Sequence, residues 1–210
     1  YLGSGKSFTD RSAVKRDLSL ALPKALEHKA PFIIGTAGGA GSKEHVAWVK
    51  EILIEVAKEQ HLNFKLGTVL SDVETEYVLE KLDSGKLIDM SSEFPADRSV
   101  IKESTRIVSQ IGIAPIIELL KKDVDVIVCG RACDTAIYAA PCIYEGYKEG
   151  LAFHMAKIME CGAMCSEPVA AADVMQGYMY DDYFELRPAN PIRRCTVDRV
   201  AAHTLYEQSN

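Results

Sequence analysis

The sequence lacks a long apolar run and an excess of positive charge, and both absences narrow what it can encode. Its longest uncharged apolar stretch, residues 111–117, is far short of the roughly 20 residues that span a bilayer. The formal net charge is -6, whereas a protein that binds a phosphate polymer needs a basic face. We therefore expect neither a membrane nor a nucleic acid as a partner.

Paired metal-ligand motifs and a disulfide framework are also missing. Cys161 and Cys165 have a spacing found in zinc sites, but no second pair with that spacing is present, so no metal is predicted. In a chain of 210 residues, cysteines placed in apolar or helical patterns favour reduced thiols and a cytoplasmic location. No residue pattern requires a cofactor. The six cysteines are Cys129, Cys133, Cys142, Cys161, Cys165 and Cys195.

What is present is the composition of an ordinary globular protein, with 48% hydrophobic and 26% charged residues. The length suits a single α/β domain over residues 1–210, with residues 168–210 as the alternative start of a second lobe. Because the chain begins at Tyr1 without a methionine and ends just after a helical pattern, we expect a fragment of a longer protein.

Hydrophobic periodicity predicts helices that alternate with strands. Thr9 or Asp10 is expected to cap a helix through Leu26, which Pro23 should kink or end early. This alternation predicts an α/β fold with a mainly parallel, Rossmann-like layered sheet and helices on both faces. The strands are expected at 32–35, 64–70, 124–129 and 184–186, a loop at 84–99, and further helices after Ser42 and from Asp72 or Glu74, then over 100–111, 115–120, 135–140, 151–161 and 197–206.

The most informative segment is Pro31–Ser42 (PFIIGTAGGAGS), where a short apolar run enters a glycine-rich turn before a helix. Glu44 stands where a dinucleotide fingerprint needs its third glycine, so that fingerprint is absent. Glycines let backbone amides approach an anion at a positive helix end. The alternative is a tight turn that needs glycine for steric reasons alone. The predicted ligand contacts are Thr36, Gly38, Gly39, Gly41 and Ser42, with the amides of Gly39 and Gly41 open to the ligand.

A second loop of this kind, Gly130–Thr135 (GRACDT), follows the apolar run 124–129. Arg131 can bind a carboxylate or phosphate through two parallel hydrogen bonds. Asp134 can act as a base, orient Arg131, or merely cap the next helix. Because ligands of parallel sheets bind at the carboxyl ends of the strands, this loop is expected to form one pocket with the glycine-rich turn and with Ser71–Asp72. Thr135 and Ser71 are predicted substrate contacts, and Asp72 is a second candidate base.

The leading segment Gly3–Ser7 (GSGKS) has the ending of a phosphate-binding P-loop, but the first glycine of that motif is not in the chain. A flexible loop that lines the pocket with Ser4 and Lys6 is the favoured interpretation. The histidines fit no nucleophile motif. His28, His45 and His61 are expected at exposed or terminal positions, and His154 and His203 in the core.

In order along the chain, several blocks resemble the N-terminal part of the AtuA family, named for acyclic terpene utilisation in bacteria. The resemblance implies a longer parent protein and makes Gly3–Ser7 a family loop rather than a nucleotide P-loop. It also implies a metabolic enzyme with an acidic or acyl-CoA substrate, without supplying a catalytic residue list. The blocks are Tyr1–Ser7 (YLGSGKS), Ile33–Gly41 (IIGTAGGAG), Asp125–Ala136 (DVIVCGRACDTA), His154–Gly162 (HMAKIMECG) and Ala201–Glu207 (AAHTLYE).

Taken together, the residues and the resemblance predict a catabolic enzyme acting on a small organic acid or acyl-CoA, of hydratase, lyase or isomerase type. Glycine-loop amides and Arg131 would hold the substrate, and Asp134 or Asp72 would move a proton. The alternative is a non-catalytic anion-binding domain or a subunit of a larger metabolic complex. A homo-oligomer or a partner subunit is expected in either case.

Overall fold

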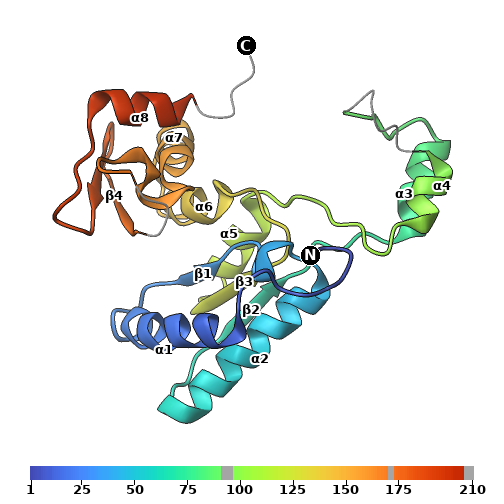
Figure 1. The fold of residues 1–210 in the computed structure, drawn as a ribbon, viewed down its shortest axis with the longest axis horizontal. Coiled ribbons are helices and arrows are strands. Elements are labelled where there is room, and N and C mark those ends of the chain that lie inside the picture. The colour runs from blue at the N-terminus through green and yellow to red at the C-terminus, as the bar shows by residue number, and fades with distance from the viewer. Residues whose placement is uncertain (91–96, 170–172, 206–210) are drawn as a thin grey trace. The chain divides into compact units, whose positions relative to one another are not determined.

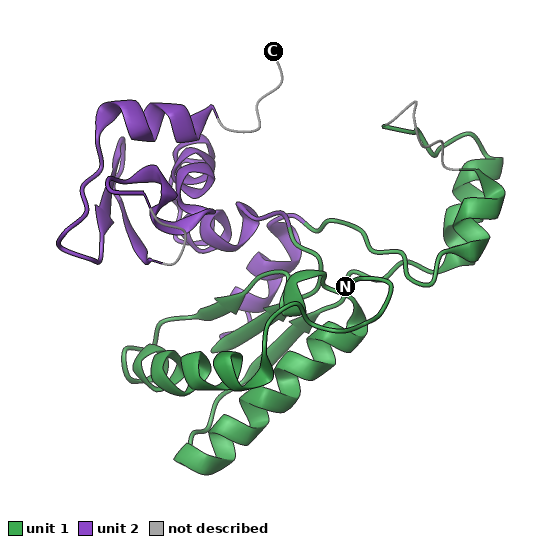
Figure 2. Cartoon of the chain, in the orientation of Figure 1, with its two compact units in different colours: residues 1–111, 124–132 green, residues 112–123, 133–210 purple. Residues whose placement is uncertain are grey.

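The computed structural model describes residues 1–90, 97–169 and 173–205, which form a mixed α/β fold (Figure 1). The chain divides into two compact units (Figure 2). Unit 1 contains residues 1–111 and 124–132, and unit 2 contains residues 112–123 and 133–210. The α/β class is therefore confirmed, and the expected single domain stays a prediction.

Unit 1 is built on a three-stranded parallel sheet in the order β1-β3-β2. The strands are β1 (Phe32–Ile34), β2 (Leu66–Val69) and β3 (Val126–Cys129). All four residues of β3 are buried, as expected for a continuous apolar run in a central parallel strand. Since the three strands run in the same direction, the loops that follow them leave from one edge of the sheet.

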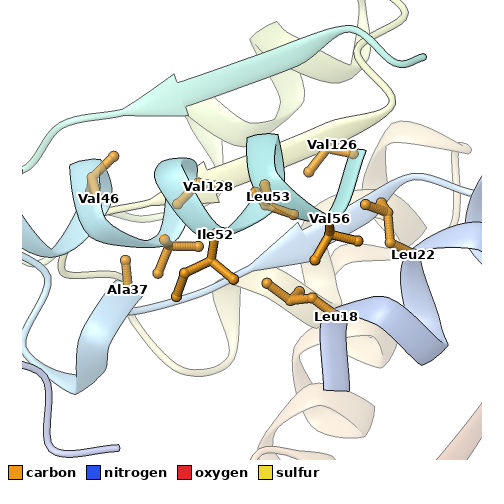
Figure 3. Close-up of a cluster of buried hydrophobic side chains, with 10 residues drawn as sticks. Leu18, Leu22, Ala37, Val46, Ile52, Leu53, Val56, Val126 and Val128 are labelled. Atoms are coloured by element: carbon orange, nitrogen blue, oxygen red, sulfur yellow. The ribbon is translucent and has the colours of Figure 1, made fainter. Parts of the chain in front are cut away.

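Two long helices, α1 (Arg11–Glu27) and α2 (Lys43–Gln60), pack on this sheet and bury the core of unit 1 (Figure 3). Asp10 caps α1 by accepting a hydrogen bond from the Ser12 amide at 2.8 Å, which confirms one of the two predicted caps. Ser42 is the N-cap of α2, also as predicted. The buried residues of this core are Leu18, Leu22, Ala37, Val46, Val49, Ile52, Leu53, Val56, Val126 and Val128.

The expectation that Pro23 ends α1 early is wrong, because the helix continues to Glu27. A proline in a helix has no N–H for the carbonyl four residues before it. Here that carbonyl belongs to Ser19, and it accepts a hydrogen bond from Nε2 of Gln60 at 3.1 Å instead. A side chain from α2 therefore satisfies the group that Pro23 leaves without a backbone partner.

The helix expected over residues 100–111 is also wrong in extent. The structure has α3 (Thr75–Asp83) and a short α4 (Arg98–Glu103), after which the chain is extended. Val108 forms an antiparallel bridge with Asp72, and Ile111 forms a parallel bridge with Ala132. Tertiary pairing with loops at the sheet edge thus overrides the local helical pattern.

The described part of unit 2 contains five helices and strands. It also contains a 3-10 turn, η2 (Gly162–Cys165), and a last helix, α8 (Val197–Thr204). Small side chains at Ala139, Ala152 and Ala156 are fully buried where α6 and α7 pack together. Residues 175–179, where no strand was predicted, form β4, in which Tyr178 pairs with Glu185 of β5. Tyr206, expected in the last helix, lies outside the described residues. The five elements are α5 (Ala114–Leu120), α6 (Ala136–Tyr144), α7 (Glu149–Met159), β4 (Met175–Met179) and β5 (Phe184–Pro188).

None of the six cysteines, all of which the structure describes, forms a disulfide bond. Within the described ranges, no helix combines the length and apolar character needed to cross a bilayer.

Candidate functional site

Three loops meet at the carboxyl edge of the sheet in unit 1, and the side chain of Ser71 joins them. Its hydroxyl donates to the carbonyl of Gly41 at 2.8 Å and accepts from the amide of Arg131 at 2.7 Å. The Arg131 amide also donates to the Gly41 carbonyl at 3.1 Å. Ser71 is only 2% exposed. The structure therefore brings together the loops after β1, β2 and β3, as the sequence predicted.

Two glycines allow this close approach. Gly41 has a φ of +76°, and a Cβ there would lie 2.1 Å from the Arg131 nitrogen. A Cβ on Gly130 would lie 2.4 Å from Oγ of Ser71. Real Cβ atoms do not approach other atoms so closely, so both positions need glycine for steric reasons.

The expectation that the amides of Gly39 and Gly41 are open to a ligand is wrong. The Gly39 amide donates to the carbonyl of Thr36, and the Gly41 amide donates to that of Ala37, both at 3.0 Å. The loop folds into a single 3-10 turn, η1 (Ala37–Gly39), whose carbonyls take up these amides. The alternative interpretation, a tight strand-to-helix turn, describes these two glycines better.

Thr36 has an unusual backbone at the end of β1. Its φ of 43° and ψ of 73° lie in the left-handed region, which is rare for a β-branched residue and is often retained at functional sites. Its hydroxyl accepts from the amide of Ala132 at 3.2 Å and donates to the carbonyl of the same residue at 3.3 Å. Thr36 thus ties the glycine-rich loop to the residue that follows Arg131.

The first turn of α2 contains a buried histidine. His45 was expected at an exposed or terminal position, and it lies at the start of α2 but has no exposed surface. Its Nδ1 accepts from the Ser42 amide at 3.2 Å and lies 2.8 Å from the Ser42 hydroxyl, forming a capping box. This arrangement assigns the ring proton to Nε2, for which the described residues offer no acceptor. The sequence contained a signal for this capping box, because His45 stands three residues after the predicted N-cap Ser42.

Arg106 connects the N-terminal loop to α2, and nothing in the sequence pointed to it. Its Nε donates to Oε2 of Glu44 at 3.0 Å, and its guanidinium donates to the carbonyl of Gly3. Hydrogen bonds from Arg106 and then from Ser42 lower the pKa of Glu44 to about 2. Ser4 and Lys6 are exposed on the loop that Arg106 holds.

Two side chains beside the Ser71 junction, Arg131 and Asp72, have charged groups without a partner among the described residues. The Arg131 side chain is half-buried, and it forms no ion pair or hydrogen bond with the residues that the structure describes. Oδ2 of Asp72 is buried and has no hydrogen-bond partner there either. Because unpaired buried charges are costly, a guanidinium and a carboxylate in this state are candidate ligand contacts.

Asp134 and Thr135, the other residues predicted for this pocket, belong to unit 2. Asp134 is exposed at the start of α6. The N-cap position belongs to Thr135, and no side chain caps the helix there, so Asp134 does not serve as the cap. Burial, followed by the charge of Asp134, raises the pKa of the Tyr138 phenol one turn further on.

Each unit has a hollow. In unit 1, a cleft of about 230 Å³ lies beside the glycine-rich loop. In unit 2, an apolar groove of about 650 Å³ lies between α7, β5 and α8. His154 lines this groove and is exposed, contrary to expectation, whereas His203 is 7% exposed, as expected for a core histidine. Among the described residues, no group of three or more His, Cys, Asp or Glu side chains is arranged to hold a metal ion.

The fold and these loops define an α/β protein whose candidate small-molecule site lies at the carboxyl edge of a small parallel sheet. The family model of the acyclic terpene utilisation family protein AtuA matches residues 9–181, and the chain therefore belongs to the AtuA family. That family is named for acyclic terpene utilisation, a catabolic process. No curated protein and no solved structure matches the chain.

Proposed function

We propose that this protein is a catabolic enzyme that acts on a small organic acid or acyl-CoA, of hydratase, lyase or isomerase type. The observation that carries the proposal is the guanidinium of Arg131, which has no ion pair or hydrogen bond with the described residues and follows the junction of three loops. Membership of the AtuA family supports a catabolic role. Since the Gly39 and Gly41 amides are already bonded within their loop, Arg131 rather than these amides is assigned the substrate anion.

The proposed chemistry begins with removal of a proton next to a carbonyl. Arg131 binds the carboxylate or carbonyl oxygen of the substrate, where negative charge develops. The carboxylate of Asp72 accepts the proton, because its Oδ2 has no hydrogen-bond partner among the residues that the structure describes. The electron pair of the broken C–H bond moves onto the carbonyl oxygen, next to the guanidinium. If the proton returns to a different carbon, the substrate is isomerised. If the β-substituent leaves instead, the reaction is an elimination.

Asp134 is the second candidate for this base, and the two aspartates are distinguished by substitution. We expect Asp72→Asn to lower turnover roughly 100-fold or more while leaving binding of a carboxylate nearly unchanged. Asp134→Asn serves as the matched variant, because Asp134 is exposed in unit 2. The measurement is exchange of the substrate proton with deuterated solvent, followed by NMR for a panel of carboxylates and acyl-CoA thioesters. If Asp134→Asn alone abolishes exchange, the roles of the two residues are reversed.

Arg131→Lys tests the anion contact directly. Lysine keeps the charge but not the planar pair of donors, so the dissociation constant for a carboxylate should rise roughly tenfold. Arg98→Lys is the control, because Arg98 forms an exposed ion pair with Asp83 and neither residue lines the cleft beside the glycine-rich loop. Equal binding by both variants contradicts the proposal. Binding that needs Arg131 without exchange or turnover of any substrate supports a non-catalytic anion-binding domain or subunit instead.

The wider setting is also part of the proposal. We propose that the sheet belongs to a Rossmann-like layered arrangement, and that the protein acts in the cytoplasm as a homo-oligomer or with a partner subunit. Six cysteines that form no disulfide bond support the compartment. Sedimentation analysis of the purified protein measures its assembly.

A further inference from the structure

Apolar side chains from four segments line the open cleft beside the glycine-rich loop in unit 1. Val14 comes from α1, Ile34 from β1, and Trp48 and Val49 from α2. Phe8 of the N-terminal segment lies at the rim, is 60% exposed, and packs on the backbone of Gly39. These walls are typical of a pocket for an apolar group.

The polar groups that line the cleft already have partners. The Thr36 hydroxyl bonds to Ala132, and its carbonyl accepts from Gly39. Asp17 forms an ion pair with Arg16 on the surface of α1. The hydroxyl of Thr9 bonds to that of Ser7 at 2.9 Å. A charged group placed in the cleft would thus lose water without gaining a free partner, whereas an apolar group would lose nothing.

The cleft and the candidate anion contact share one structural link. Thr36 lines the cleft, and its side chain bonds to both backbone groups of Ala132, the residue next to Arg131. The left-handed backbone of Thr36 is therefore fixed between the two. A ligand with an apolar part and an anionic part matches this arrangement.

We propose that the cleft holds the apolar chain of an acid or acyl thioester whose carboxyl or carbonyl end is bound by Arg131. This inference rests on the function proposed above and names its substrate class as one with a hydrocarbon chain. The cleft has a limited volume of about 230 Å³, so affinity is expected to rise with chain length only until the cleft is full.

The test is calorimetric titration with straight-chain carboxylates from acetate to decanoate, beside the matching neutral alcohols. Affinity should rise about threefold to fourfold for each added methylene and level off once the cleft is full. Val14→Phe fills the cleft and should abolish this rise in affinity with chain length. Leu20→Phe is the matched control, because Leu20 is on the same helix, 70% exposed, and outside the cleft. Thr9→Trp at the exposed rim is a second blocking variant should Val14→Phe fail to fold.

The outcomes separate this inference from the function on which it rests. If carboxylates bind only when Arg131 is present, but with an affinity that does not depend on chain length, the assignment of the cleft is wrong and the proposed function stands. If alcohols and carboxylates bind equally well, and their affinity falls with Val14→Phe but not with Arg131→Lys, the cleft is a site for apolar chains. That second result overturns the assignment of the carboxylate to Arg131, and with it the proposed function.

Discussion

At the scale of single residues, one hydroxyl group organises the candidate site. Ser71 bonds to both Gly41 and Arg131 and is almost completely buried. A buried hydroxyl with both a donor and an acceptor function in use fixes the loops that it joins, because leaving either partner unpaired is costly. The position of the Arg131 backbone is thus set before any ligand arrives, which is the preorganisation that an anion site requires.

The same junction predicts a large difference between two glycine-to-alanine substitutions. Both Gly41 and Gly85 have a left-handed backbone, but only Gly41 faces other atoms where a Cβ would lie. We expect Gly85→Ala to lower the free energy of unfolding by about 1 kcal/mol, and Gly41→Ala by about 3 kcal/mol or more. Urea titration followed by the fluorescence of Trp48, the chain's one tryptophan, reports on unit 1. Equal losses would contradict the close approach of Gly41 to Arg131.

Sequence patterns located the residues that follow strands but not the state of their backbone groups. Gly41, Ser71 and Arg131 were predicted correctly as neighbours, because parallel strands deliver their loops to one edge. Whether the amide of Gly41 was free could not be predicted, since that depends on which carbonyl the turn presents to it. Arg106 was missed because its partner Glu44 is 62 positions away in the sequence.

At the scale of elements, the N-terminal loop is held by the first turn of α2 through an ion pair. The pKa of Glu44 is about 2 because of its hydrogen bonds to Arg106 and Ser42, against an ordinary value of 4.5. As the pH falls, the unfolded chain therefore binds a proton at Glu44 before the folded chain does. The stabilisation by Glu44 is complete above about pH 5 and is lost between about pH 5 and 2.

We expect the difference in unfolding free energy between the wild type and Glu44→Gln to show the same dependence on pH. The wild type should be more stable at neutral pH, and the difference should shrink to zero near pH 2, as measured by urea unfolding at a series of pH values. The effect should be modest, because the Glu44 side chain is 38% exposed. Glu51→Gln, an exposed position on the same helix, is the control. A difference independent of pH would contradict the ion pair.

The elements that the sequence predicted well are those whose burial follows from local periodicity. The buried face of α2, with Val46, Val49 and Leu53, matches the expected spacing. The extended segment that ends at Ile111 was predicted as a helix, because local spacing carries no information about its bridges to the sheet edge. Pro23 was misjudged for a similar reason, since the relief comes from Gln60 on another helix.

At the scale of the whole molecule, the net charge of the chain predicts that it does not bind nucleic acids. At pH 7 the chain carries a formal net charge of -6, so it repels a phosphate polymer. Basic proteins bind DNA non-specifically with dissociation constants of about 10⁻⁴ to 10⁻⁶ M. We expect no change in the fluorescence anisotropy of a labelled duplex at protein concentrations across that range and at low salt. Binding that weakens as salt is added would contradict this prediction.

The division into two units was not visible in the sequence, because each unit is assembled from two separate stretches of chain. Composition changes little at the crossings near residues 111, 123 and 132. Tertiary contacts alone define these boundaries. Strand β4 of unit 2 was missed in the same way, since it is recognised by its pairing with β5, which was predicted at residues 184–186.

The order of the strands also has a consequence for synthesis on the ribosome. β1 and β2 pair only through β3, which is made last. At about 5–20 residues per second, roughly 3–11 s pass between Val69, at the end of β2, and Val126, at the start of β3. During that time β1 and β2 have no strand to pair with, and one face of α2 has no sheet to pack against. The nascent chain is therefore a natural client for chaperones that shield exposed strands until the central one emerges.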